Sequence, residues 1–388
     1  MRKINQYLEK IVPLMQNSLL PSALFAAAVW LFCAYGNFTP AINITLHSLF
    51  YSLVLAVFLI LLYFNRSKPI FFLAVLTLGY IVINGVKNLY GVDYTASAAY
   101  QNLSLFLPLN LLFFFFWPDK RLLSRINVWI LLALFTQYAI VEQLSRHGVN
   151  LNIGSDKTAA LSGLAVYVFM AVIIIAFAAF TRDESLMNSG MFFAIMCAFG
   201  GLAASAEASG LTIFFTTAVL IIITSLGRNI YNETYKDPLT GLDSRNSYII
   251  HSRKFPLKYS IAIVSIDDYD KLQAFGKRNR NIITRLIAER ICELEKEEHI
   301  YRYSEDEFVI VYRNLDKKET IQRVEEIRRA IASALFQYNA HKKALKLTVS
   351  AAVSEKKRSD ASSHEVLLRV DKALQKTRRF SHNVTSPA

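Results

Sequence analysis

The sequence predicts two structural parts: a polytopic α-helical membrane region, followed by a soluble α/β domain with a mixed sheet and surrounding helices. Apolar residues make up 53% of the 388 residues, which is more than soluble proteins usually contain. They gather in long runs up to residue 227, and each run has a length that suits a bilayer-spanning helix. Beyond that point the composition is charged, and helical and strand periodicities alternate, as expected where helices pack on a sheet.

The membrane region is expected to contain about eight spans, because a bilayer-crossing helix needs roughly 17–25 mostly apolar residues. The seventh run is the weakest, since Gly200 and Gly201 are followed by more small residues and by Glu207. Counts of seven or six therefore stay open. The expected spans are 19–36, 45–64, 69–86, 101–117, 126–143, 159–180, 190–207 and 210–227.

Basic residues in the loops predict the orientation of these spans. Lys and Arg favour the cytoplasmic side of a membrane, so we expect both termini and the soluble domain in the cytoplasm. The loops opposite the N-terminus carry few basic residues, namely Lys87, Arg146 and Lys157. The loops on the N-terminal side, together with the segment after the last span, carry Arg66, Lys68, Lys120, Arg121, Arg125, Arg182, Arg228 and Lys236.

Charge and cysteine usage exclude several classes of function. The ionisable residues His47, Glu142 and Glu207 lie near span ends, whereas a transport pathway places such groups inside the bundle. A sensory or anchoring region is therefore favoured over a transporter. The net charge of +13 suits cytoplasmic loops that face anionic lipid, and we expect no nucleic-acid partner. The three cysteines are scattered and predict neither a disulfide framework nor a zinc site.

The soluble domain is expected over 237–388, after a membrane region at 1–227 and a short linker at 228–236. Its central feature is a predicted hairpin, IYRYSEDEFVIVY at 300–312, whose turn positions are Ser304 and Glu305. Around it the patterns predict helices at 243–254, 280–297, 316–338 and 363–379, and strands at 258–266 and 344–353.

Five segments in order resemble the GGDEF, or diguanylate cyclase, domain family. They are DPLTGLDSR (237–245), SIDDYDKLQAFGK (265–277), RYSEDEF (302–308), TVSAAV (348–353) and VDKALQKTRRFSHN (370–383). The resemblance implies a nucleotidyl-cyclase-like palm domain in a protein of the bacterial inner membrane. It also implies that two GTP-loaded domains pair as a homodimer and form cyclic di-GMP with the help of magnesium.

The metal site that this resemblance implies is incomplete. In the family, two carboxylates hold the metal, one at the end of the strand before the hairpin and one in the hairpin. Asp306 stands at the second position, but Ser265 replaces the first carboxylate, and a serine hydroxyl is a weak magnesium ligand. Asp267, two residues further along, is the alternative carboxylate. Glu307 stands at a vestigial catalytic position, and no working catalytic residue is expected.

The phosphate-binding turn also departs from the family pattern. Ser304 and Glu305 replace the two glycines that bring the backbone close to the phosphates. We expect a changed turn shape, because a non-glycine residue at positive φ costs roughly 1–2 kcal/mol. Glu305 also places an anion beside the triphosphate, and such a contact costs on the order of several kcal/mol in partly desolvated surroundings.

The remaining nucleotide-binding positions are polar but altered. Gln273 and Asn281 stand where the family recognises guanine, with Arg280 in place of a glycine, and Lys277 is a further candidate. Arg378 keeps a cation at a phosphate-facing position, although a solvated basic helix face explains it equally well, and His382 replaces an arginine. At the family's product-inhibition site, Glu295 and Glu298 flank Lys296 and Glu297, so no such site is expected.

We therefore predict a membrane-anchored, catalytically inactive GGDEF protein that contacts an unknown protein partner in signalling linked to cyclic di-GMP, such as biofilm or exopolysaccharide control. Two alternatives stay open. One is an active or weakly active diguanylate cyclase that uses magnesium. The other is a sensor that binds GTP or cyclic di-GMP without turning it over. No cofactor is expected for the inactive protein.

Overall fold

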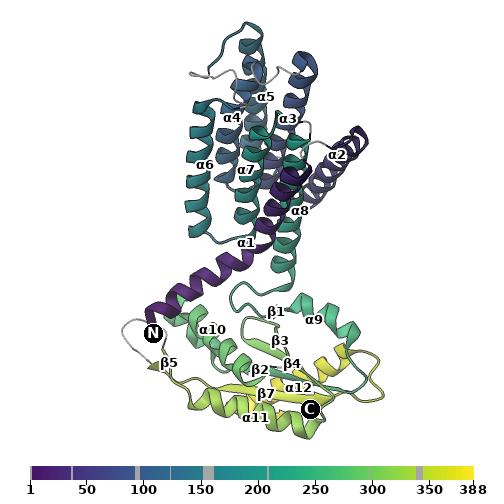
Figure 1. Cartoon of the computed structure of the whole chain (residues 1–388). Coiled ribbons are helices and arrows are strands. Elements are labelled where there is room, and N and C mark those ends of the chain that lie inside the picture. The colour runs from purple at the N-terminus through teal and green to yellow at the C-terminus, as the bar shows by residue number, and fades with distance from the viewer. Residues whose placement is uncertain are drawn as a thin grey trace. The chain divides into compact units, whose positions relative to one another are not determined.

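The computed structural model describes residues 2–35, 38–91, 97–122, 124–151, 161–207, 209–296, 298–337 and 344–388. The side chains of residues 2–11, 273, 275, 337 and 344 lie outside this description, as do Lys157 and Glu297. The chain divides into two compact units, Met1–Asn229 and Ile230–Ala388, which are described separately below (Figure 1).

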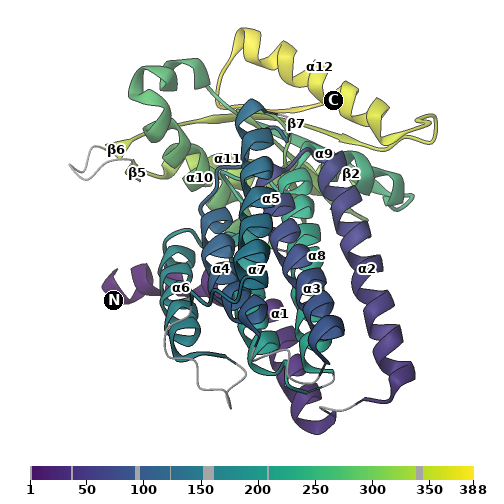
Figure 2. The ribbon, with the colours of Figure 1, turned by 90° about the horizontal axis from the view of Figure 1, so that it is seen from above.

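The first unit is helical, and the predicted count of spans is confirmed. Among the described residues, 8 helices are long and apolar enough to cross a membrane. Helices α3, α4, α7 and α8 are the most buried, whereas α2 lies at the edge of the bundle (Figure 2). The eight helices are α1 (Arg2–Tyr35), α2 (Pro40–Tyr63), α3 (Ser67–Tyr90), α4 (Ala98–Phe115), α5 (Arg125–Arg146), α6 (Gly163–Arg182), α7 (Leu186–Ala203) and α8 (Gly210–Tyr235).

Helix α8 is longer than the sequence predicts. Its apolar stretch ends near residue 227 as expected, but the helix continues to Tyr235, so most of the expected linker at 228–236 is helical. Residues 228–235 contain neither proline nor an internal glycine, so nothing in their backbone stops the helix. The second unit therefore begins within α8, whose last residues belong to it.

The second unit is an α/β domain built on a six-stranded mixed sheet of order β1-β3-β4-β2-β7-β8. The central strand β2 pairs antiparallel with both β4 and β7, while β1 with β3 and β7 with β8 form parallel pairs at the two edges. The elements are β1 (Asp243–Ser244), α9 (Arg245–His251), η2 (Ser252–Lys254), β2 (Tyr259–Ile266), η3 (Tyr269–Phe275), α10 (Gly276–Leu294), β3 (His299–Arg302), β4 (Glu307–Arg313), α11 (Lys317–Ser333), β5 (Phe336–Gln337), β6 (Ala344–Leu345), β7 (Val349–Glu355), α12 (Ser363–Phe380) and β8 (Thr385–Pro387).

Both faces of this sheet are covered, which explains why β2 is apolar without alternation. Successive side chains of a strand point to opposite faces. Val264 faces a core formed with α10 and α11, and Ile263 faces a second core formed with α9 and α12. A strand buried on both faces reads as a continuous apolar run, and every residue of β2 is buried.

Three of the predicted elements are corrected. The helix expected over 316–338 ends at Ser333, because Ala334 is extended and Phe336 joins the core as part of β5. The strand expected over 344–353 is split into β6 and β7, and only β7 joins the main sheet. The helix expected over 243–254 is shorter, since Asp243 and Ser244 form β1 beside β3.

A polar cluster holds the C-terminal strand β8 against α11. Arg328 donates to Glu325 through both Nε (2.8 Å) and Nη2 (2.6 Å), and its Nη1 donates to Asn383 Oδ1 (2.6 Å). Thr385 Oγ1 donates to the same Glu325 carboxylate (2.9 Å). The hydrogen bonds from Arg328, opposed by partial burial and helped by those from Thr385 and Arg329, lower the pKa of Glu325 to about 2.

This shift predicts how the stability of the domain depends on pH. Because the folded-state pKa lies below the ordinary 4.5, the stabilisation is present above pH 4.5 and is lost as pH falls toward 2. The variant Glu325→Gln should be less stable at pH 7 and should show a shallower loss of unfolding free energy below pH 4.5, measured by urea unfolding. The exposed neighbour Glu326 gives the matched control, and Glu326→Gln should follow the wild type. An equally steep loss in Glu325→Gln would contradict the assignment.

Candidate functional site

The candidate site lies where β2 ends beside the hairpin of β3 and β4. Ser265 is fully buried and pairs with Glu307 of β4 on one side and Ser350 of β7 on the other. Its Oγ donates a hydrogen bond to Asp306 Oδ2 (3.1 Å). The serine hydroxyl therefore supports the Asp306 carboxylate from the position at which the sequence predicts a missing carboxylate.

The acidic turn is a four-residue loop, 303–306, rather than the two-residue turn that the sequence predicts. The backbone N–H groups of Tyr303 (2.9 Å) and Ser304 (3.3 Å) both donate to the carbonyl of Glu307. Among the described residues, the non-glycine residues with positive φ are Asn65, Asp268, Asn314 and Asn383. Ser304 and Glu305 thus avoid the left-handed region, because the longer loop removes the need for it.

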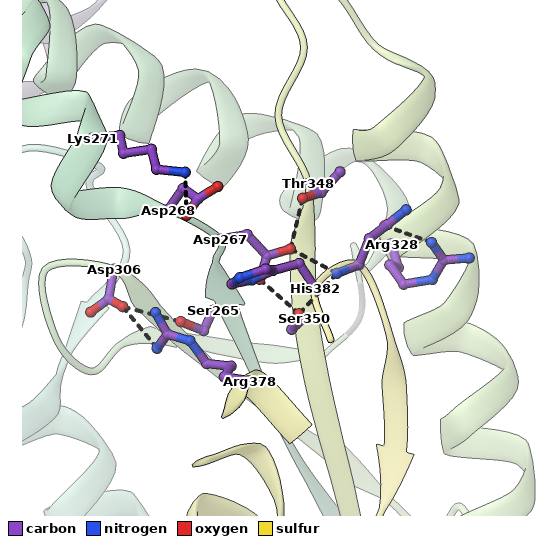
Figure 3. Close-up of polar contacts among 11 residues, drawn as sticks. Ser265, Asp267, Asp268, Lys271, Asp306, Arg328, Thr348, Ser350, Arg378 and His382 are labelled. Carbon is purple, nitrogen blue, oxygen red and sulfur yellow. Dashed lines mark hydrogen bonds and ion pairs between the residues drawn. The ribbon is translucent and has the colours of Figure 1, made fainter. Parts of the chain in front are cut away.

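Other groups of the chain contact the carboxylates of the loop. Ser304 Oγ lies within hydrogen-bonding distance of Asp306 Oδ1 (3.0 Å) and Glu307 Oε2 (3.3 Å). Arg378 of α12 donates from Nη1 to Asp306 Oδ2 (3.3 Å). The close-up in Figure 3 shows Arg378 and Ser265 converging on Asp306. The carboxylate expected to hold a metal thus contacts two hydroxyls and a guanidinium.

Glu305 has a cationic partner that sequence reasoning missed. Arg280 Nη1 lies 3.9 Å from Glu305 Oε2, and the Arg280 guanidinium also lies over the Tyr269 ring, 5.6 Å from its centroid. Arg280 is 19% exposed in this pair and Glu305 74%, so the attraction itself is weak. The sequence did contain an indication of this pair, because Arg280 and Glu305 both stand where the family resemblance implies a glycine and they carry opposite charges.

Arg302 connects the acidic loop to Asp237. Its Nη1 donates to both carboxylate oxygens of Asp237 (3.0 and 2.8 Å), and its Nη2 donates to the carbonyl of Glu305 (3.3 Å). Burial raises the pKa of Asp237, but the hydrogen bonds from Arg302 and Thr240 outweigh it, so the net pKa is lowered. At Glu307, burial first and the charge of Asp306 second raise the pKa. The fold therefore shifts the pKa values of Asp237 and Glu307 in opposite directions.

Asp267 does not turn toward the acidic loop. This buried carboxylate accepts hydrogen bonds from Thr348 Oγ1 (2.7 Å), Ser350 Oγ (2.7 Å) and the backbone N–H of Asn383 (2.9 Å). His382 Nδ1 lies 3.4 Å from it. These partners lie on β7, on the residue just before it and on the segment before β8, so Asp267 and Asp306 serve opposite sides of β2 (Figure 3).

The other predicted nucleotide-binding residues are dispersed around α10. Lys277 is exposed at its first turn, Asn281 is half-buried one turn later, and Gln273 lies in η3 with its side chain outside the described residues. None of the hydrogen bonds among the described side chains joins Lys277 or Asn281 to the acidic loop. The structure thus brings together Ser265, Ser304, Glu305, Asp306, Glu307 and Arg378.

Glu295 and Glu298, which replace the family's product-inhibition site, take part in an internal ion-pair cluster. Arg323 of α11 lies 3.1 Å from Glu295 and 3.8 Å from Glu298. Tyr312 donates its hydroxyl to Glu295 (3.1 Å), and burial followed by the Glu295 charge raises the pKa of Tyr312. Burial also raises the pKa of Glu298. Both glutamates therefore join α11 to the sheet.

Comparison with known families assigns the second unit. The model of the family described as "Diguanylate cyclase, GGDEF domain" matches residues 234–383. Residues 234–383 are a GGDEF domain. This relates the chain to cyclic di-GMP signalling and confirms the resemblance drawn from the sequence. No curated protein matches the chain.

Solved structures similar to the chain include GGDEF domains and a diguanylate cyclase. The GGDEF domain of FimX from Pseudomonas aeruginosa is 17% identical, with 39% of this chain and 98% of that chain covered and a TM-score of 0.37. The coiled coil and GGDEF domain of DgcB from Caulobacter crescentus, in complex with cyclic di-GMP, is 20% identical over 45% of this chain and 95% of that one, with a TM-score of 0.41. Diguanylate cyclase SiaD in complex with its activator SiaC, from P. aeruginosa, is 16% identical over 65% and 91%, with a TM-score of 0.38.

Proposed function

We propose that this protein is a membrane-anchored GGDEF protein that makes no cyclic di-GMP and acts by contact with a protein partner in cyclic di-GMP signalling, such as biofilm or exopolysaccharide control. The observation that carries the proposal is that groups of the chain itself already occupy the Asp306 carboxylate. Its carboxylate is held by Ser265, Ser304 and Arg378, so a metal would have to displace groups that the fold itself supplies.

The donor set around Asp306 does not fit magnesium. Mg²⁺ requires close to six oxygen ligands in octahedral geometry and dehydrates reluctantly. Ser265 offers a neutral hydroxyl, Glu307 has a raised pKa and Arg378 adds a positive charge. Asp267, the alternative carboxylate that the sequence offers, already accepts three hydrogen bonds on the far side of β2.

The nucleotide is disfavoured by the same loop. Glu305 is 74% exposed at the tip, where the family resemblance places the triphosphate. It adds a like charge beside the phosphates, and this repulsion grows as a bound nucleotide displaces water from the loop. Arg280 lies against Tyr269 at the position where the resemblance implies a glycine beside the guanine. Both the phosphate side and the base side of the site are thus occupied by side chains.

The first unit supplies the anchor in this proposal. Its 8 apolar helices have the length needed to span a bilayer. The excess of basic residues in the loops on the N-terminal side supports a bacterial inner-membrane protein with both termini in the cytoplasm. A homodimer through the GGDEF domain and a further protein partner complete the proposal.

The test is product formation by the full-length protein in lipid nanodiscs, supplied with GTP and magnesium and analysed by mass spectrometry. We expect no cyclic di-GMP above the no-enzyme control, with an active GGDEF cyclase as the positive control. Sustained product formation would overturn the proposal. Calorimetry with GTP on the same sample should give no binding heat, whereas binding without turnover would favour the nucleotide-sensor alternative.

A further inference from the structure

A cleft in the helical unit lies beside polar groups that the proposed function does not use. It has a volume of about 770 Å³, within the range of about 300–1,000 Å³ that is usual for small-molecule sites. Its walls are α3 from Ile81 to Tyr90 and α5 from Phe135 to Arg146, and its floor is α4 at Ala99 and Leu103. The cleft therefore lies where α3 and α5 end and α4 begins, at one end of the helical unit.

The packing of the floor keeps this cleft open. At Gly79, α3 approaches α4 so closely that an added Cβ would lie 2.9 Å from Leu107 Cδ1. Two turns later, an added Cβ at Gly85 would meet no atom within 4 Å. Asn102 fixes the other wall, because its Nδ2 donates to Ser145 Oγ (3.1 Å) and to the carbonyl of Val149 (2.8 Å). Helices α3 and α4 thus pack closely at Gly79 and leave a space at Gly85.

The lining of the cleft is amphipathic. Most of the lining side chains are aliphatic or aromatic, and the charged ones are Glu142 and Arg146. These two residues form an i,i+4 ion pair at 2.6 Å with side chains 62% and 66% exposed. An exposed pair of this kind is worth only about 0.3–0.5 kcal/mol, so Arg146 can exchange its partner for another anion at little cost.

We propose that this cleft binds an anionic amphiphile, with its long apolar chain between α3 and α5 and its acidic headgroup on Arg146. The apolar chain packs against the aliphatic and aromatic lining, and the guanidinium pairs with the acid. The acid can belong to a free long-chain carboxylic acid or to an anionic phospholipid, since both present the same chemistry to the cleft.

The test uses full-length protein in phosphatidylcholine nanodiscs and a photoactivatable palmitic acid as the probe. We expect saturable crosslinking to residues 81–90 and 135–146, suppressed by unlabelled palmitate. The variant Gly85→Phe fills the cleft from α3 and should reduce the labelling about tenfold or more, equivalent to 1.4 kcal/mol. Gly163→Phe on α6, where an added Cβ also meets nothing within 4 Å, is the matched control and should label as the wild type does.

Two further variants extend the test. One keeps it informative if Gly85→Phe does not fold, and the other examines the headgroup. Ala139→Phe fills the cleft from α5 and should give the same loss. Arg146→Gln should weaken competition by palmitate but not by hexadecanol, its neutral analogue. Competition by phosphatidylglycerol would assign the site to membrane lipid, and competition by palmitate alone would assign it to a free acid. Labelling that is unsaturable, equally strong on the peripheral helix α2, or unchanged in both filling variants would overturn the proposal.

Discussion

Replacing Arg302 by alanine is expected to lower the unfolding free energy of the GGDEF domain by about 3–5 kcal/mol, because it leaves a largely buried carboxylate without its cation. The Arg302 and Asp237 side chains are only 12% and 17% exposed, and the guanidinium lies 2.8 Å from the carboxylate. The same side chain supports the acidic loop through the carbonyl of Glu305. Urea unfolding of residues 230–388, followed by circular dichroism, measures the loss.

The double variant Arg302→Ala/Asp237→Asn is the control for this prediction. Removing the charge of Asp237 should restore a large part of the lost stability, since the penalty arises from the unpaired carboxylate rather than from the missing attraction. The pKa of Asp237 is lowered in the folded state, so the difference between wild type and Arg302→Ala should shrink as pH falls through that pKa. A loss smaller than about 1 kcal/mol, typical of exposed ion pairs, would contradict the prediction.

Restoring the expected family residues at positions 265, 304 and 305 alone is not expected to create a cyclase. The variant Ser265→Asp/Ser304→Gly/Glu305→Gly regains a carboxylate and two glycines, but Arg280 keeps its place over Tyr269 and has lost its partner Glu305. We expect no cyclic di-GMP from this triple variant in the nanodisc assay. Adding Arg280→Gly and Asn281→Asp should give product at least about tenfold above the detection limit, below which the triple variant stays, which corresponds to a barrier lowered by at least about 1.4 kcal/mol.

Two comparisons make this result interpretable. Arg280→Gly/Asn281→Asp in the wild-type loop should stay inactive, because Glu305 still opposes the triphosphate. Product from the triple variant would show that Arg280 does not obstruct the site. No product from the variant with all five changes would show that other departures, such as Gln273 or His382, also prevent catalysis, since losses in a shared site are not additive.

The arrangement of elements in the GGDEF domain was largely predictable, whereas their ends were not. The amphipathic pattern of α10 and the apolar run of β2 follow from burial on one or both faces. Strand β8 was missed, because Thr385–Pro387 has no strand pattern and gains its hydrogen bonds only by lying parallel to β7. The early end of α11 was missed for a related reason, since Phe336 leaves the helix to reach the core.

The sequence by itself determined the apolar helices, the order of strands and helices around the hairpin, and the replacement of glycines and a carboxylate at the site, because periodicity and residue identity are local properties. Only the tertiary structure decided where the replacement side chains go. It placed Arg280 beside Glu305, Arg378 and Ser265 on Asp306, and Asp267 on the opposite side of β2. These pairs join segments distant in the chain, and their contacts depend on the packing of α10 and α12 against the sheet rather than on any spacing in the sequence.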